Sequence, residues 1–95
     1  MKPYTEQKIE ESVFIRTFFS DIPEEELQWH WDEEDRIVEA IETTDWKFQF
    51  DNQLPIPFDK PIRVDAGDFH RVIKGSGDLV VKVTKLPTTV RINRM

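Results

Sequence analysis

Short apolar runs separated by turn-forming residues recur along the whole chain, and this spacing restricts what it can fold into. The clearest run covers residues 46–51, where Trp46, Phe48 and Phe50 alternate with polar side chains in the two-residue period of a half-buried strand. Turn signals return about every ten residues, which leaves no segment long enough for the helices of an α/β fold. We therefore predict an all-β protein of about eight short strands, a β-sandwich or small barrel.

Runs of β-branched and aromatic residues, or of alternating apolar and polar residues, predict the individual strands. They lie at 12–19, 27–32, 36–42, 46–51, 62–65, 70–73 and 79–84, with a last short strand at 90–92. Three prolines between residues 54 and 61 restrict that stretch to an edge strand or an extended connection. A short helix at 33–42 is the alternative to the third strand, because Ile37 and Ile41 are also spaced by four residues.

Three polar segments carry weaker signals. Residues 1–11 show no apolar pattern, so we expect a loose N-terminal arm. In residues 20–27, Pro23 is followed by three glutamates, which favours a single helical turn. The acidic run at 32–35 is interpreted as a solvated turn, because neighbouring carboxylates are rarely buried.

Length and composition limit the architecture and the function. A chain of 95 residues makes one domain, spanning residues 1–95. It contains no cysteine, so disulfides and thiolate sites are excluded and any metal must be held by nitrogen and oxygen ligands. The net charge of −6 argues against nucleic acid as a partner. No apolar run approaches membrane-spanning length and no signal peptide is recognisable, so we expect a cytoplasmic protein without membrane association.

One of the two histidines follows a turn. Residues 62–65 form a short alternating run that ends where Ala66, Gly67 and Asp68 turn the chain, and His70 begins the next run. A histidine in this position lies at the mouth of a sheet. The alternative is a half-exposed strand residue without a functional role.

The other histidine lies in the predicted strand at 27–32. Alternation places Trp29 and Trp31 on one face of this strand and His30 and Asp32 on the other. Burial of apolar area favours the tryptophans as the core face, because an indole removes more apolar surface from water than an imidazole. The opposite orientation would place both polar side chains inside the protein.

The order of these pieces resembles the small single-domain cupins, the RmlC-like jelly rolls, and the resemblance covers residues 27–84. The second cupin motif has the form P-x-G-x-x-H and carries a metal-binding histidine. Residues 65–70 match it, with Gly67 and His70 in place and Asp65 where proline is usual. The resemblance implies a cupin-like jelly-roll fold with His70 facing the pocket.

The first cupin motif is H-x-H followed, after three or four residues, by glutamate. His30 matches the first histidine, Asp32 replaces the second, and Arg36 stands where the glutamate is expected. The resemblance therefore implies His30, His70 and Asp32 as the ligands of a divalent metal. A metal is nevertheless not favoured, because the guanidinium of Arg36 would place a permanent positive charge beside it. Arg36 is better suited to pairing with Asp32 or with an anionic ligand.

The resemblance implies a barrel pocket that binds a small polar or anionic ligand. Its predicted lining combines aromatic and polar side chains: Trp46, Phe48, Phe50, His30, Asp32, Arg36 and His70. Within it, either histidine could serve as a general base or orient the ligand. The fold itself supplies no reaction, so whether the chain is an enzyme stays open.

If His30 and Asp32 face the pocket, as the resemblance implies, Trp29 and Trp31 face outward. We then expect them to be covered by the N-terminal arm, by the first strand, or by a second subunit in a homodimer. A different class of function is the alternative: a non-catalytic structural or interaction protein with a degenerate cupin pocket.

Overall fold

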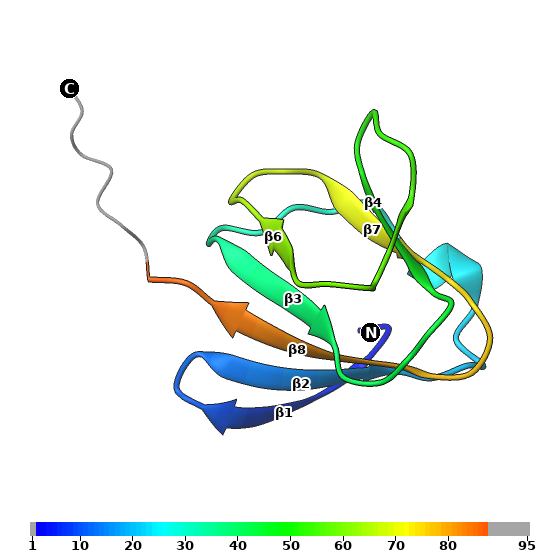
Figure 1. Cartoon of the computed structure of the whole chain (residues 1–95), viewed down its shortest axis with the longest axis horizontal. Helices are drawn as coiled ribbons and strands as arrows, with labels where there is room; N and C mark the ends of the chain where they lie inside the picture. Colours follow the sequence, from blue (N-terminus) through cyan, green and yellow to red (C-terminus); the bar gives the residue numbers. More distant parts are fainter. Residues whose placement is uncertain (1, 88–95) are drawn as a thin grey trace.

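The computed structural model describes residues 2–87, and within them eight strands form two antiparallel sheets (Figure 1). The larger sheet has the order β1 (Thr5–Glu10), β2 (Val13–Phe18), β8 (Leu79–Lys85), β3 (Arg36–Ala40) and β6 (Ile62–Val64). The smaller sheet has the order β5 (Ile56–Pro57), β4 (Lys47–Phe50) and β7 (His70–Ile73). A 3-10 turn, Glu24–Glu26, follows β2. The architecture is the predicted all-β jelly roll.

The core lies between the two sheets. Alternation along β8 buries Leu79, Val81 and Val83, and these side chains meet Phe18 of β2 and Trp46. The Trp46 side chain is fully buried, and its indole Nε1 donates a hydrogen bond to the Gly77 carbonyl at 3.0 Å. Burial of an indole with its polar edge satisfied stabilises the fold by several kcal/mol, roughly the cost of truncating a buried aromatic side chain.

Most predicted strands are confirmed. β2, β4, β6, β7 and β8 lie within or close to their predicted ranges, and β5 is the edge strand that the prolines require. β3 settles the choice at 33–42 in favour of a strand, because Ile37 and its neighbours pair with β6 and β8. The predicted strand at 90–92 lies outside the described residues.

Two expectations about elements are wrong. Thr5–Glu10 is no loose arm: it forms β1, which pairs antiparallel with β2. All its residues are exposed, so an edge strand of this kind leaves no apolar alternation in the sequence. Residues 27–32 form no continuous strand either, since only His30 pairs, in an isolated bridge with His70. The 3-10 turn before this segment and the turn after it leave only its middle beside β7.

The acidic run at 32–35 is not the solvated turn that we expected, because Asp35 is buried and Asp32 is largely so. Asp35 Oδ1 accepts a hydrogen bond from the Ala66 backbone N–H at 2.8 Å, and its Oδ2 lies 3.1 Å from Arg63 Nη2. These contacts tie the start of β3 to the turn that precedes His70. In the described part of the chain, no helix could cross a membrane.

Candidate metal and ligand site

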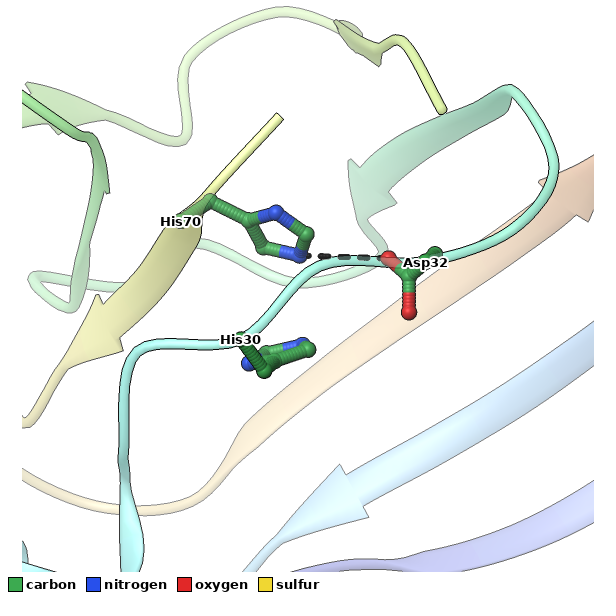
Figure 2. Close-up of side chains that lie close together, drawn as sticks. All are labelled: His30, Asp32 and His70. Carbon is green, nitrogen blue, oxygen red and sulfur yellow. Dashed lines mark ion pairs between the residues drawn. The ribbon is translucent and has the colours of Figure 1, made fainter. Parts of the chain in front are cut away.

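His30 and His70 face each other across an antiparallel bridge. The His30 N–H bonds to the His70 carbonyl at 3.0 Å, and the His70 N–H bonds to the His30 carbonyl at 2.9 Å. Directly opposed residues project from the same face, and the two ring centroids lie 4.3 Å apart. Asp32, two residues beyond His30, lies on that face too and completes a group of three (Figure 2).

The turn at 65–68 holds the two halves of this group together. Gly67 has a φ of +87°, a conformation that strains any other residue, and its N–H bonds to the Asp32 carbonyl at 2.9 Å. The same turn presents the Asp68 carbonyl, which lies 2.8 Å from His70 Nδ1. The glycine of the predicted motif therefore positions Asp32 and His70 at once.

Both imidazoles are held through the same ring nitrogen. His30 Nδ1 lies 3.0 Å from the Gln28 carbonyl, as His70 Nδ1 does from that of Asp68. A carbonyl oxygen can only accept, so in each ring Nδ1 carries the proton and donates it. The neutral ring then has its lone pair on Nε2. Metal-binding histidines are commonly oriented in this way, by a carbonyl on the other nitrogen.

The Asp32 carboxylate is buried and only partly satisfied. Its Oδ2 lies 3.3 Å from His70 Nε2, yet it accepts no hydrogen bond from any described residue. Its Oδ1 lies 3.5 Å from Arg36 Nη2. Burial by itself raises the pKa of the Asp32 carboxyl, but the His70 ring when it is protonated on Nε2, together with the Arg36 guanidinium, outweighs this effect and holds the pKa below its usual value. The group is thus a carboxylate at neutral pH.

These three side chains fit a divalent metal ion. One ligand atom from each of His30, Asp32 and His70 lies within 4.8 Å of the other two. Two imidazoles and one carboxylate are the donor set of mononuclear Fe(II), Mn(II) and related sites. Ligand atoms on one such ion lie about 3–4 Å apart, so small side-chain rotations bring the set to bonding distance. A cation there would also satisfy the orphaned Asp32 oxygen.

The charge of Arg36 is offset locally. Its Nε and Nη2 lie 3.1 Å and 2.5 Å from Glu34 Oε2, closer than either is to Asp32. Arg36 thus pairs with two carboxylates, and its side chain is only 10% exposed. The sequence-based objection to a metal is therefore weaker in the folded chain, because Glu34 balances much of the positive charge.

A cavity opens beside the three side chains. Its outer part, of about 420 Å³, and a smaller inner recess both have His30, Asp32 and Arg36 in their walls. Phe48 and His70 line the recess, where their rings stack with centroids 5.3 Å apart. This volume is within the range of small-molecule sites.

Two predicted lining residues belong to the core instead. Trp46 precedes β4, and its fully buried ring packs on Phe18, so it lines neither part of the cavity. Phe50 packs edge-on against Phe48 and also lies outside the lining. Alternation correctly places them on the inner face of the smaller sheet, but only Phe48 reaches the cavity.

Arg16 of β2 is a cavity residue that the sequence did not single out. It lines both parts of the cavity with His30, Asp32 and Arg36. The available signal was its register: Arg16 shares the inner face of its strand with Phe18, where an apolar residue is usual.

No protein-family model matches the chain, and no curated protein sequence matches it. Solved structures do. A chain of the DMSP lyase structures RdDddP and RnDddQII aligns over 87% of this chain with a TM-score of 0.64 and 13% identity. FeII HppE aligns over 78% with a TM-score of 0.59 and 12% identity. A cupin domain from Bordetella pertussis Tohama I aligns over 92% of this chain and 98% of its own length, with a TM-score of 0.55 and 18% identity. The chain has the cupin fold.

The cupin likeness does not extend over the whole of every neighbour. The chain spans about two fifths of the length of FeII HppE and of the DMSP lyase chain, 41% and 42% respectively. It matches the Bordetella pertussis domain almost end to end. At these identities the comparisons establish the fold of the chain and leave its chemistry to its own side chains.

Trp29 and Trp31 are not core residues. They are 40% and 51% exposed, so the orientation with tryptophans in the core is wrong, and neither the N-terminal segment nor the first strand buries them. Trp29 borders the outer cavity together with Lys2 and Tyr4, and the Arg71 guanidinium carbon lies 4.6 Å from its ring centroid.

Proposed function

We propose that this cupin pocket binds a divalent first-row transition metal through His30, Asp32 and His70, and a small anionic ligand beside it. The observation that supports this most is the buried Asp32 Oδ2, which accepts no hydrogen bond from residues 2–87 and lies 3.3 Å from the ring nitrogen of His70 that is free to bind a ligand. Without a cation or an added proton, two lone pairs face each other there. A metal ion bound between the two atoms would accept both lone pairs.

The donor set favours iron(II) or manganese(II) over calcium or magnesium, because two of its three ligands are imidazoles. One structural neighbour is named as an iron(II) protein, which agrees with that choice. When bound, such an ion supplies Lewis acidity toward a ligand oxygen. Among the chain's own groups, Arg36 orients an anionic ligand, and the carbonyls of Gln28 and Asp68 fix the two rings.

Metal titration tests the proposal. Chelator-treated protein is titrated calorimetrically with Mn²⁺ and, without oxygen, with Fe²⁺; we expect one ion per chain and a rise in Tm. Asp32→Asn preserves the shape of the side chain and removes its charge, so we expect it to weaken binding by about tenfold or more. Asp59→Asn, at an exposed aspartate, is the matched control and should bind as the wild type does. Equal affinity in both variants would show that the metal binds elsewhere.

Homodimerisation belongs to the same proposal. The exposure of Trp29 and Trp31, on either side of the His30 bridge, supports a second copy as their cover. Light scattering of the wild type should then give twice the chain mass, and the double variant Trp29→Ser, Trp31→Ser should give the monomer mass. A wild type that stays monomeric at high concentration would contradict this.

A further inference from the structure

Arg16 occupies a place in the pocket that neither core packing nor the metal explains. It comes from β2, and its side chain is only 13% exposed. It borders both the outer cavity and the inner recess, together with the proposed ligands His30 and Asp32. A buried guanidinium costs free energy unless it is paired or has a function.

Two residues of the N-terminal region hold this guanidinium. Glu6 of β1 lies directly opposite Arg16 in the strand register, and its Oε2 accepts a hydrogen bond from Arg16 Nε at 2.6 Å. The Tyr4 ring lies against one face of the guanidinium, with 4.3 Å between the ring centroid and the guanidinium carbon. The edge strand that the sequence did not predict therefore orients the arginine.

The other end of the Arg16 side chain is open toward the cavity. Among the side-chain hydrogen bonds of the described residues, Arg16 donates through Nε to Glu6, which leaves its two Nη groups for the cavity that the residue lines. Those groups carry four N–H donors in a plane, which matches the oxygens of a carboxylate or phosphate. Held at Nε and stacked on one face, they are pre-organised to receive such a group.

The charges around the cavity agree with an anion. Three cationic side chains, Lys2, Arg16 and Arg36, border the outer cavity, against the carboxylates of Glu26 and Asp32. Glu6 and Glu34, which pair with Arg16 and Arg36, are not among the wall residues, so the side chains that face the cavity are mostly cationic. The inner recess is walled mainly by apolar side chains, Val64 and Val81 among them. A ligand with an anionic head and an apolar part matches both regions.

We infer that Arg16 is the anchor for the anionic head group of the pocket's ligand, and that this ligand is a small organic carboxylate or phosphate with an apolar part. The inference rests on the proposed function for the pocket, and it adds the ligand class and the residue that selects it. Glu6 and Tyr4 act through Arg16 as positioning residues.

Three matched probes test this: benzoate, phenyl phosphate and neutral benzamide. Their affinities are measured by calorimetry on Mn²⁺-loaded protein and on chelator-treated protein, so that direct contact of the probe with the metal is separated from contact with Arg16. We expect at least one of the two anions to bind the wild type about tenfold more tightly than benzamide does. Which anion binds distinguishes a carboxylate head from a phosphate head.

Arg16→Gln should weaken binding of that anion by about tenfold, while its Mn²⁺ affinity stays within about twofold of the wild type. Lys60→Gln, at an exposed lysine that borders neither part of the cavity, is the control and should change neither value. Equal anion affinity in Arg16→Gln and the wild type, or wild-type protein that binds benzamide as well as either anion, overturns the inference. If the wild-type protein binds no Mn²⁺, the proposed metal site is wrong, and the anion affinities of the chelator-treated protein still test the role of Arg16. Should Arg16→Gln not fold, Arg16→Lys keeps the charge but loses the planar pair of Nη groups, so the anion should still bind more weakly, and an unchanged affinity would overturn the inference.

Discussion

His30 and His70 are brought together by their own backbones: each N–H bonds to the carbonyl of the other, at 3.0 Å and 2.9 Å. The two imidazoles are therefore adjacent before any ligand arrives. A site assembled in this way loses little conformational entropy when it binds a metal ion. Because the pairing uses backbone atoms alone, replacing a histidine side chain leaves the bridge intact, so its effect on metal binding can be measured apart from its effect on folding.

Replacement of the two histidines should show that separation. His30 is exposed, and its bridge uses only backbone atoms, so His30→Ala should change the free energy of unfolding by no more than about 1 kcal/mol. His70 is buried and stacks on Phe48, so His70→Ala should cost about 2 kcal/mol. Urea unfolding measures both values. Calorimetry should find Mn²⁺ binding severely weakened in each, and retention of it in His30→Ala would remove that residue from the site.

Replacement of Arg36 tests the effect of its charge on the metal. Arg36 Nη2 lies 3.5 Å from Asp32 Oδ1, so its positive charge opposes a cation there even though Glu34 offsets part of it. Arg36→Gln should therefore tighten Mn²⁺ binding, by roughly three- to tenfold. The same variant should be less stable without metal, since the partly buried carboxylates Asp32 and Glu34 lose an ionic partner. Weaker Mn²⁺ binding in Arg36→Gln would mean that the guanidinium supports the site.

The glycines of two turns should respond differently to alanine. A Cβ at Gly75 would lie 2.7 Å from the Trp46 backbone nitrogen, a contact that forces the backbone apart. Gly67 meets no atom within 4 Å but has a φ of +87°. We expect Gly67→Ala to cost about 1 kcal/mol and Gly75→Ala about 3 kcal/mol in the free energy of unfolding. Chemical denaturation gives the order, and a reversed order would show that the close approach at Gly75 is wrong.

Asp45 should make stability depend on pH at the acid end. Hydrogen bonds from the Ser76 backbone N–H and hydroxyl, at 2.8 Å and 2.9 Å, lower the pKa of the Asp45 carboxyl below its usual value. A lowered folded-state pKa stabilises the fold above the unfolded-state value of about 3.9, and that contribution is lost as the pH falls through the folded-state pKa. Asp45→Asn should thus be less stable than the wild type at pH 7, with the difference shrinking below pH 4 or so. A difference that does not change with pH would exclude this carboxylate as the cause; Asp59→Asn is the control.

The parts of the fold that alternate strictly could be predicted from the sequence. β8 buries every second residue, the apolar and polar side chains of β4 alternate in the sequence, and Gly67 marks the turn before His70. β1 could not be predicted, since both of its faces are exposed and, within residues 2–87, the strand that pairs with it is β2. Its pairing is a tertiary contact, which local sequence does not encode.

The candidate site was predictable only in outline. The motif resemblance placed His30, Asp32 and His70 together, and the structure brings them within 4.8 Å of one another. The sequence did not predict that Glu34 pairs with Arg36, because a carboxylate in an acidic turn is usually solvated. Trp46 was misassigned to the pocket, since alternation gives the face of a strand but not how deep a side chain lies.

A crystal structure of the protein grown with Mn²⁺, with anomalous diffraction data, would show the proposed metal site itself. We expect an anomalous peak bonded to one nitrogen of His30, one nitrogen of His70 and a carboxylate oxygen of Asp32, at about 2.0–2.3 Å from each. A well-ordered site with no such peak, with Asp32 Oδ2 instead paired to a protonated His70 or to the Arg36 guanidinium, would contradict the proposal.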